Sequence, residues 1–255
     1  MSQDLVGVNA VVTGAGNGLG LAIAQCFVAG GAKVLLVDQD PAVSKRVGSA
    51  DLPISHASAL VQDLAEADAA VRVFEAARKT LGQITTLVND AAWSFHKPML
   101  EVTREEFDRV VHINQRAPYF LVQEFCRDIA NARTKPINPT IINIASVNAS
   151  RGNPNLVAYA GTKGAVVAMT RAMAVEMGPL GVRVVSISPG AVETAHTRSL
   201  IKSGVIDPPK LFEKALVKRF AQSEEVAELV AYLASSRATF VTGSDWAFDG
   251  GYLAY

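Results

Sequence analysis

The chain has 255 residues, of which 49% are apolar and 19% charged, a balance typical of a protein with a filled core rather than a disordered one. Lysine plus arginine and aspartate plus glutamate number 24 each, so no basic excess indicates a nucleic-acid partner. No apolar run approaches the roughly 20 residues that cross a bilayer. The N-terminus does not resemble a signal peptide, so we expect a cytoplasmic protein without a membrane partner.

The cysteines and histidines indicate neither a disulfide framework nor a metal site. Cys26 and Cys126 are far apart and lie in apolar helical patterns, which predicts buried free thiols in a reducing compartment. The four histidines lack the spacing of metal ligands, so we expect no metal.

The chain opens with a predicted strand, a glycine-rich turn and a helix. Residues 8–13 are a short apolar run, and the stretch 14–20 leads into a helical pattern that ends at Gly30. Glycines let the backbone approach a pyrophosphate, and a helix N-terminus offers free N–H groups and a positive dipole. The spacing is not G-x-G-x-x-G, because Leu19 stands where its third glycine would be. A tight connection is the alternative, but the position after an N-terminal strand favours nucleotide binding.

The predicted second strand, residues 33–37, ends at Asp38, about 20 residues beyond the glycine turn. A carboxylate there can accept hydrogen bonds from both hydroxyls of an adenosine ribose, and it would repel the 2′-phosphate of NADP. The alternative is an aspartate that merely ends a strand in a turn. We favour ribose binding, with NAD as the cofactor.

The middle of the chain continues the alternation of strands and helices. Residues 55–62 and 84–88 are predicted to be the third and fourth strands, with a helix at 65–81 between them. The next helix starts after Thr103, which forms a predicted capping box with Glu106.

Asn114 is predicted to lie on the apolar face of that helix. Phe107, Val110, Val111 and Asn114 recur at i, i+3, i+4 and i+7. A buried amide needs partners, so Asn114 is either a satisfied core residue or a functional one. Pro118 lacks the N–H that would otherwise occupy the Asn114 carbonyl, which favours a functional role.

The stretch from 146 to 163 carries the clearest chemistry. It follows an apolar run at 141–145, and a helix is predicted over 157–177. Tyr159 and Lys163 are four residues apart and therefore share a helix face. A phenol has a pKa of about 10, and a neighbouring ammonium favours the phenolate, so the pair predicts a tyrosine that can accept a proton. By itself the pair is a weak signal, because this spacing occurs on many exposed helices.

Several motifs, taken in order, resemble the short-chain dehydrogenase/reductase family. Residues 13–20 match T-G-x-x-x-G-x-G, residues 189–194 match P-G-x-x-x-T, and Ser146 with Tyr159 and Lys163 matches Ser…Tyr-x-x-x-Lys. The resemblance covers essentially the whole chain. It implies that Tyr159 is the catalytic acid/base and that Ser146 hydrogen-bonds the reacting oxygen. It also implies that Lys163 lowers the tyrosine pKa and holds the nicotinamide ribose, while Asn114 places a relay water.

The resemblance also implies a set of cofactor contacts. Asp63 resembles the family aspartate that meets the adenine amino group, although a helix cap explains it nearly as well. The family usually has Asn-Asn-Ala-Gly at 89–92, and Asp90 and Ala92 depart from that pattern. Asn17 and Gln39 stand where NADP-binding members carry basic residues, which again favours NAD. The full predicted set is Gly14, Asn17, Gly18, Leu19, Asp38, Gln39, Asp63, Leu64, Asn89, Ala91, Tyr159, Lys163, Pro189, Gly190, Val192 and Thr194.

The order of elements predicts an α/β fold. We expect a single domain over residues 1–255, a Rossmann-like doubly wound parallel sheet of about seven strands in the order 3-2-1-4-5-6-7, with helices on both faces. Residues 182–188 and 246–251 would supply the last strands. Residues 195–220 lack regular alternation, and we expect a substrate lid around 191–220. Ser223 is expected to cap the last helix.

These features predict an NAD-dependent oxidoreductase that moves hydride between a secondary alcohol or ketone and the nicotinamide. The polar groups of the expected pocket suit a small hydroxylated substrate such as a sugar or polyol. Reduction of a 3-oxoacyl thioester or other ketone is the runner-up, and a nucleotide-sensing module is the non-enzyme alternative. Small residues on the helix at 157–177, and the family's habit of forming tetramers, imply a homo-oligomer, a tetramer or dimer. Substrate contacts are expected from Trp93, Phe95, His96, Ser146, Asn148, Asn153, Tyr159 and His196.

Overall fold

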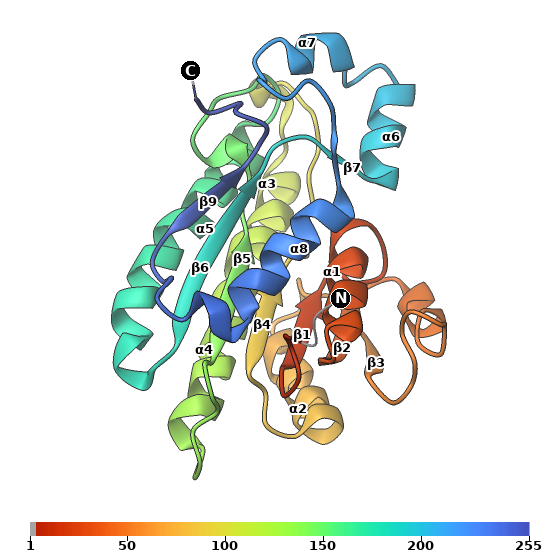
Figure 1. Cartoon of the computed structure of the whole chain (residues 1–255). Helices are drawn as coiled ribbons and strands as arrows, with labels where there is room; N and C mark the ends of the chain where they lie inside the picture. Colours follow the sequence, from red (N-terminus) through yellow and green to blue (C-terminus); the bar gives the residue numbers. More distant parts are fainter. Residues whose placement is uncertain (1–3, 255) are drawn as a thin grey trace.

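The computed structural model describes residues 4–254, which form one three-layer α/β domain around a parallel sheet of seven strands (Figure 1). The sheet order is β3-β2-β1-β4-β5-β6-β9, so the predicted order is confirmed, with β9 as the seventh strand. The strands are β1 (Asn9–Thr13), β2 (Lys33–Asp38), β3 (Ala57–Val61), β4 (Thr86–Asn89), β5 (Thr140–Ile144), β6 (Arg183–Pro189) and β9 (Asp245–Phe248).

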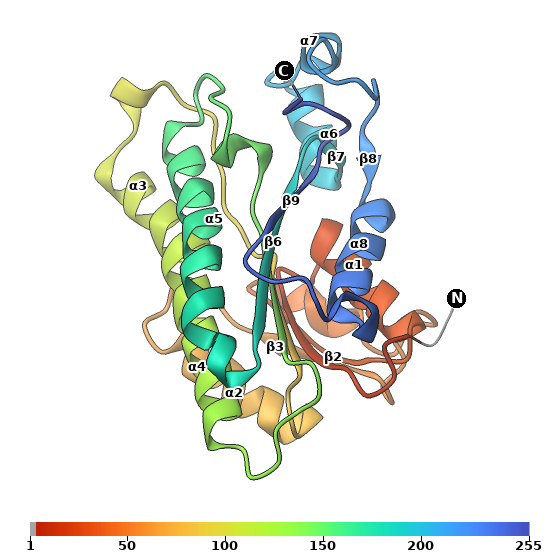
Figure 2. The same cartoon turned by 60° about the vertical axis from the view of Figure 1, so that its left-hand side comes forward.

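Helices cover both faces of the sheet, as Figure 2 shows in a view along its edge. The helices α1 (Gly18–Ala29) and α8 (Ser223–Ala234) pack together on one face. The other face carries α2 (Ala69–Leu81), α4 (Ala117–Asn131) and α5 (Val157–Met177), with α3 (Arg104–Val111) outside them. Because both faces are covered, the central strands read as continuous apolar runs rather than as alternating ones.

Each face has its own apolar core, and alternate residues of one strand serve both. On β1, Ala10 and Val12 belong to the core under α1 and α8, together with Phe27. Val11, between them, points to the opposite core, which contains Phe74 and Phe125. This is the two-residue period of a strand. The paired cores hold the strand ends rigidly, which fixes the loops that carry the site.

The predicted apolar stripe around Asn114 was only partly right. A π-helical segment, His112–Arg116, separates α3 from α4. A π turn adds a residue to the helix, so positions seven apart across it no longer share a face. As a result Phe107 is half exposed while Asn114 is buried. In this segment the N–H of Ala117 donates to the carbonyl of His112, five residues earlier, and the free Asn114 carbonyl expected from Pro118 stays a prediction.

The segment expected to be a structureless lid is partly helical. It contains α6 (Ala195–Lys202) and α7 (Pro208–Phe212), which lie at the top of the view in Figure 1. Two helix-start signals, Thr194 as the cap of α6 and the prolines at the start of α7, are not revealed by a lack of sheet-like alternation. The prediction that Ser223 caps α8 is also wrong. The cap is Gln222, which forms the capping box with Glu225, and Ser223 is the first helical residue.

Candidate active site

A cleft of about 290 Å³ opens at the carboxyl ends of β1, β2 and β4. This is the point where the strand order reverses, because β1 is followed by β2 on one side and bordered by β4 on the other. Ten of the sixteen residues predicted to contact the cofactor line it. They are Gly14, Asn17, Gly18, Leu19, Asp38, Gln39, Asp63, Leu64, Ala91 and Thr194.

The glycine turn beneath this cleft needs its glycines. Gly14 has φ 68°, and a Cβ there would lie 2.9 Å from the Ala91 backbone. A Cβ on Gly20 would lie 2.3 Å from the carbonyl oxygen of Gly14. Gly18 has φ 55°, and a Cβ there would lie 3.6 Å from the Thr194 side chain on the other side of the opening. The glycines therefore leave backbone exposed at the N-terminus of α1, an arrangement that fits a dinucleotide pyrophosphate.

Asp38 stands at the rim of the cleft and is held by backbone amides. Its Oδ2 accepts from the N–H of Gly16 at 2.9 Å, and its Oδ1 accepts from the N–H of Asp40 at 2.9 Å. Arg46, which the sequence reasoning missed, donates from Nε to the carbonyl oxygen of Gly16 at 3.0 Å. This end of the cleft thus has an oriented carboxylate and a neighbouring guanidinium.

Ser146, Tyr159 and Lys163 lie next to the cleft, where β5 ends and α5 begins. Ser146 Oγ accepts hydrogen bonds from the backbone and side-chain nitrogens of Asn148, both at 3.2 Å. Lys163 Nζ donates to the carbonyl oxygen of Ile144 at 2.7 Å and lies 5.7 Å from the centre of the Tyr159 ring. The predicted catalytic groups therefore converge on one side of the sheet's end.

The electrostatics of Tyr159 differ from the expectation. Burial raises the pKa of Tyr159 to about 12, the Ser146 hydroxyl lowers it through a hydrogen bond, and the charge of Asp90 raises it. Burial lowers the pKa of Lys163, and Asp90 opposes that shift. The expected lowering of the tyrosine pKa by Lys163 is not seen here, because desolvation of the phenolate dominates and the ammonium is turned toward Ile144.

Asn114 is buried, and its amide is fully engaged. Its Oδ1 accepts from the N–H of Trp93 at 2.8 Å, and its Nδ2 donates to the Trp93 carbonyl at 2.9 Å and to Thr162 Oγ1 at 3.2 Å. The side chain thus ties the loop after β4 to α5, one residue before Lys163. The relay water implied by the resemblance stays a prediction.

Three predicted cofactor residues lie behind the clefts rather than in their described walls. Asn89 donates from Nδ2 to Asn143 Oδ1 at 2.9 Å, and Asn143 in turn donates to Thr170 Oγ1 at 2.9 Å. This chain links β4 through β5 to α5, so Asn89 supports the site from within the core. Pro189 is buried at the end of β6, and Lys163 points to the Ile144 carbonyl.

A second and larger cavity, of about 1170 Å³, opens beside Tyr159 and Ser146 and reaches under α6 and α7. Gly190 and Val192, from the predicted cofactor set, line this cavity. Its polar wall contains the predicted substrate residues His96, Asn148, Asn153 and His196.

The polar wall is ordered by hydrogen bonds. Asn153 donates from Nδ2 to Asn148 Oδ1 at 2.7 Å, and Tyr252 Oη donates to Asn153 Oδ1 at 3.1 Å. Tyr252 was missed, because no local signal connects it to a loop 99 residues earlier. Burial lowers the pKa of His96, and the nearby His196 lowers it further. The two imidazoles line the same cavity, His96 from the loop after β4 and His196 from α6.

Trp93 and Phe95, predicted to contact substrate, are not among the described residues that line this cavity. Trp93 lines the cofactor cleft instead. Its ring lies 5.1 Å from that of Phe95 and is covered by the guanidinium of Arg109 at 4.8 Å. The Asn114 hydrogen bonds turn the loop so that these rings pack on each other.

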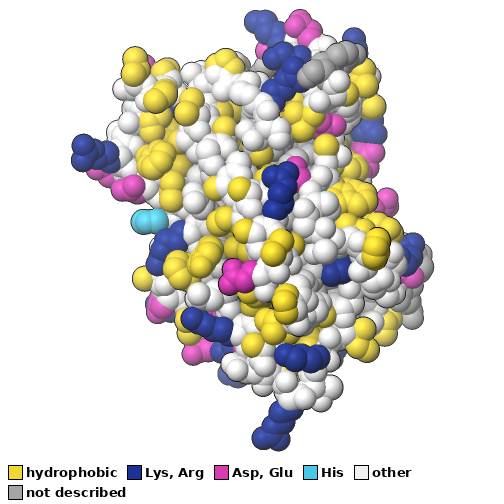
Figure 3. All heavy atoms as spheres, turned by 90° about the vertical axis from the view of Figure 1, so that its left-hand side faces the viewer, with side chains coloured by type: hydrophobic (Ala, Val, Ile, Leu, Met, Phe, Trp, Pro, Cys, Tyr) yellow, Lys and Arg dark blue, Asp and Glu magenta, His cyan; other side chains and the backbone are white. Residues whose placement is uncertain are grey.

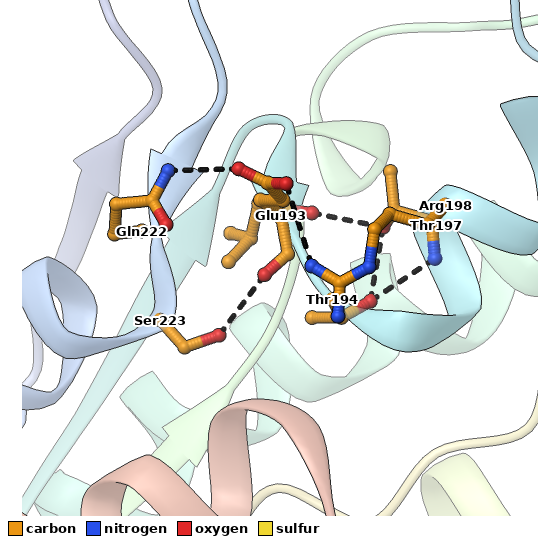
Figure 4. Close-up of polar contacts among 7 residues, drawn as sticks. Glu193, Thr194, Thr197, Arg198, Gln222 and Ser223 are labelled. Atoms are coloured by element: carbon orange, nitrogen blue, oxygen red, sulfur yellow. Dashed lines mark hydrogen bonds and ion pairs between the residues drawn. The ribbon is translucent and has the colours of Figure 1, made fainter.

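The base of the α6–α7 segment is clamped, as the close-up in Figure 4 shows. Strand β7 (Val192–Glu193) pairs with β8 (Ala221–Gln222) and so joins the two ends of the segment. Glu193 accepts from Gln222 at 2.9 Å and from Arg198 at 3.3 Å. Thr194 caps α6 by accepting from the N–H of Thr197 at 3.1 Å. Because Thr194 also faces the glycine turn, the segment is anchored at the cofactor cleft.

Comparisons with known proteins agree with this geometry. The family model described as "Enoyl-(Acyl carrier protein) reductase" matches residues 14–253. L-xylulose reductase of Bos taurus is 35% identical over 100% of both chains. Meso-2,3-butanediol dehydrogenase of Serratia marcescens is 34% identical and covers 96% of this chain and 94% of its own.

Solved structures of oxidoreductases have similar folds over nearly the whole chain. The 3-ketoacyl-(acyl-carrier-protein) reductase of Brucella melitensis complexed with NADH has a TM-score of 0.86 and 34% identity, covering 97% of this chain and 99% of its own. A putative NAD(P)-dependent gluconate 5-dehydrogenase of Beutenbergia cavernae with bound NADP has a TM-score of 0.88 and 33% identity, covering 100% of both chains. The chain belongs to the short-chain dehydrogenase/reductase family of oxidoreductases, which use a nicotinamide cofactor.

Proposed function

We propose that the protein is an NAD-dependent dehydrogenase that interconverts a secondary alcohol and a ketone. The observation that carries the proposal is the convergence of Ser146, Tyr159 and Lys163 beside a cleft that contains the glycine turn. When bound, the nicotinamide accepts or supplies the hydride. The protein's own residues orient the substrate and handle the proton.

Tyr159 is the proposed acid/base. In alcohol oxidation its phenolate oxygen takes the proton of the substrate hydroxyl, and in ketone reduction its hydroxyl returns that proton. The Ser146 hydroxyl donates to the same substrate oxygen and stabilises the charge that develops there. Lys163 holds the nicotinamide ribose, and the hydrogen bond from Ser146 is what favours the phenolate. Asn114, one hydrogen bond from Thr162, places the relay water that carries the proton to solvent.

The proposed preference for NAD rests on Asp38. Its carboxylate is oriented at the ribose end of the cleft by two backbone amides. A 2′-phosphate placed beside it would meet like charge. Arg46 could favour NADP, because its guanidinium lies near the glycine turn and could pair with a 2′-phosphate. However, its Nε already donates to the Gly16 carbonyl. Proteins similar to this one include both NADH and NADP complexes, so the discrimination depends on this chain's own rim.

For the substrate we propose a small hydroxylated molecule such as a sugar or polyol. The wall nearest Tyr159 offers the amides of Asn148 and Asn153, the hydroxyl of Tyr252 and two imidazoles. Such an array can bond several hydroxyl groups at once. The similarity to L-xylulose reductase and meso-2,3-butanediol dehydrogenase supports the same class.

One observation favours the runner-up, reduction of a 3-oxoacyl thioester. Under α6 and α7 the cavity wall turns apolar, with Leu200, Ile206, Leu211 and Phe212. An acyl chain would bury this surface better than a sugar would. The deciding experiment is a screen that follows the absorbance of NADH and NADPH with sugars, polyols, simple secondary alcohols and 3-oxoacyl thioesters. Turnover of thioesters alone would favour the runner-up. Tight NADH binding with no turnover of any substrate would favour the nucleotide-sensing module.

We also propose a homo-oligomer, either a tetramer or a dimer, formed through the face of α4 and α5. Figure 3 shows this side of the molecule, where apolar side chains lie among scattered charges. Tyr119, Phe120 and Val175 are respectively 46%, 38% and 81% exposed on these helices. A face on which both helices expose apolar side chains suits a contact surface. Mass by light scattering tests it, and a monomer at micromolar concentration would exclude it.

We propose a cytoplasmic location, without nucleic-acid partners. None of the helices between residues 4 and 254 is long and apolar enough to cross a lipid bilayer. Cys26 and Cys126 are both free, as predicted, although Cys26 is only partly buried. Burial raises the pKa of the Cys126 thiol to about 11, which suits an unreactive core residue.

A further inference from the structure

Asp90 is the departure from the family pattern that the proposed function leaves without a role. It follows β4, and its N–H donates to Thr13 Oγ1 at 3.1 Å, as does the next N–H in the chain. Its carboxylate lies against the first turn of α1, with Oδ2 2.8 Å from where a Cβ on Gly20 would be. It also lines the cofactor cleft beside Gly14 and Gly18. A carboxylate is thus built into the floor where the structure offers N–H groups to an anion.

The charged and titratable groups that face Asp90 come from two other elements. Lys163 and Tyr159, on α5, and Asp38, at the end of β2, are the groups whose charges interact with it. Burial raises the pKa of Asp90 to about 7, the positive charge of Lys163 and the N–H of Gly20 lower it, and Asp38 raises it. The shift places the group where it can change its charge near neutral pH.

A pyrophosphate at the N-terminus of α1 would use the same N–H groups and the same dipole as the Asp90 carboxylate. Two like charges cannot both be stabilised in one partly buried site, so binding of the second raises the pKa of the first. The protonated acid has no charge and the shape of the asparagine that the family usually carries. We propose that Asp90 takes up a proton from solvent when the dinucleotide binds, so that cofactor affinity is set by pH at this residue.

The inference rests on the proposed cofactor site and deepens it. Its consequence is a cofactor affinity that falls as pH rises through neutrality, because above that range a charged Asp90 remains in the cleft. Tyr159 stays protonated on both sides of neutrality and cannot supply the effect. Lys163 is the competing group, since burial lowers its pKa and a nearby anion would raise it again. The contributions of Asp90 and Lys163 are distinguished by the variant Asp90→Asn.

The test is calorimetric titration of NADH into the full chain near about pH 7 in two buffers with different ionisation enthalpies, which counts the protons exchanged. We expect the parent to take up somewhat less than about half a proton, because the group is already half protonated at that pH, and to bind about ten-fold more tightly near pH 6 than near pH 8.5, the effect of about one pKa unit. Asp90→Asn should take up essentially none and should bind about equally at both values. ADP-ribose, which retains the pyrophosphate but lacks the nicotinamide, should behave as NADH does.

Asp63→Asn is the matched control, because it removes a different carboxylate from the same cleft. It should retain the proton uptake even if its affinity changes. If the parent protein binds NADH without taking up protons, the inference is overturned. This outcome is measured on the parent alone and does not depend on whether a variant folds. Uptake that persists in Asp90→Asn assigns the proton to Lys163 and also overturns it. Absence of any heat with NADH, NADPH or ADP-ribose would instead overturn the proposed cofactor site itself.

Discussion

Lys163 donates to the carbonyl oxygen of Ile144 at 2.7 Å, so the ammonium bridges α5 to the end of β5 instead of touching the Tyr159 hydroxyl. The contact fixes the position of its charge beside the tyrosine ring, 5.7 Å from the centre. It leaves the phenol governed by burial and by Ser146. The Ser146 hydroxyl, rather than Lys163, is therefore the group that lowers the pKa of Tyr159.

Replacing the Tyr159 hydroxyl should remove the proton transfer while sparing cofactor binding. For Tyr159→Phe we expect alcohol oxidation to fall by roughly a thousand-fold, within the range for loss of a general acid/base. Because the ring remains, NADH binding measured by fluorescence should change by less than about three-fold. Oxidation at the parent's rate would refute the assignment.

The pH dependence should differ between the two directions. Burial raises the pKa of Tyr159 to about 12, so the hydroxyl is protonated at neutral pH. Oxidation needs the phenolate and should accelerate as pH rises from about 7 to about 10, by up to ten-fold per unit where chemistry limits the rate. Reduction needs the protonated form and should stay flat until the alkaline side. A deuterated substrate checks that hydride transfer is rate-limiting, and a flat oxidation profile under that condition would contradict the prediction.

Cofactor choice should respond to Asp38. Removing its charge in Asp38→Ser eliminates the repulsion of a 2′-phosphate and leaves Arg46 as a nearby cation. We expect kcat/KM for NADP relative to NAD to rise by about ten- to a hundred-fold, because one close like-charge pair at a partly exposed site contributes on the order of 1 to 3 kcal/mol. Asp40→Asn is the control, since that carboxylate caps the 3-10 turn at Pro41–Lys45. If both variants keep the parent's ratio, Asp38 does not select the cofactor.

The glycine turn should not tolerate a side chain at Gly20. A Cβ there would lie 2.3 Å from the Gly14 carbonyl and 2.8 Å from Asp90, and backbone cannot yield to it cheaply. Gly20→Ala should lose nucleotide binding and destabilise the fold by roughly 1 to 3 kcal/mol. Gly161→Ala, at an exposed position inside α5 with nothing within 4 Å, should be neutral or stabilising by up to about 1 kcal/mol. Thermal melts and NADH titration of both variants measure the contrast, which equal effects would refute.

Burial of Asp90 should also appear in the stability of the protein without cofactor. Its folded pKa, about 7, exceeds that of an unfolded aspartate, so the native state binds more protons between about pH 4 and about pH 7. The stability gained from this proton is present at acidic pH and is lost as pH rises through about 7. Asp90→Asn should therefore gain stability relative to the parent across that window, up to about 4 kcal/mol. Urea unfolding at several pH values tests this, and a constant difference would argue against a buried ionisable Asp90.

Much of the fold and of the catalytic set was decided by the sequence. Alternating apolar runs and helical patterns predict parallel strands joined by right-handed crossovers, and the resemblance to the family implies the order in which they lie. The Tyr159–Lys163 pair follows from helix geometry alone, because residues four apart share a face. Gly14, Gly18 and Asp38 sit in the cleft because they directly follow strands whose carboxyl ends meet at one edge.

Only the tertiary structure decided which groups touch across long separations in the chain. The π-helical segment at His112–Arg116 buries Asn114 and exposes Phe107, a phase change that a regular helical period cannot reveal. Tyr252 reaches Asn153, and the Asp90 carboxylate meets α1 beside Lys163, through loops that carry no periodic signal. Local spacing fixes what a strand or helix presents, because backbone geometry repeats. The charge state of a buried group depends on neighbours brought in by packing, and these are known only once the chain has folded.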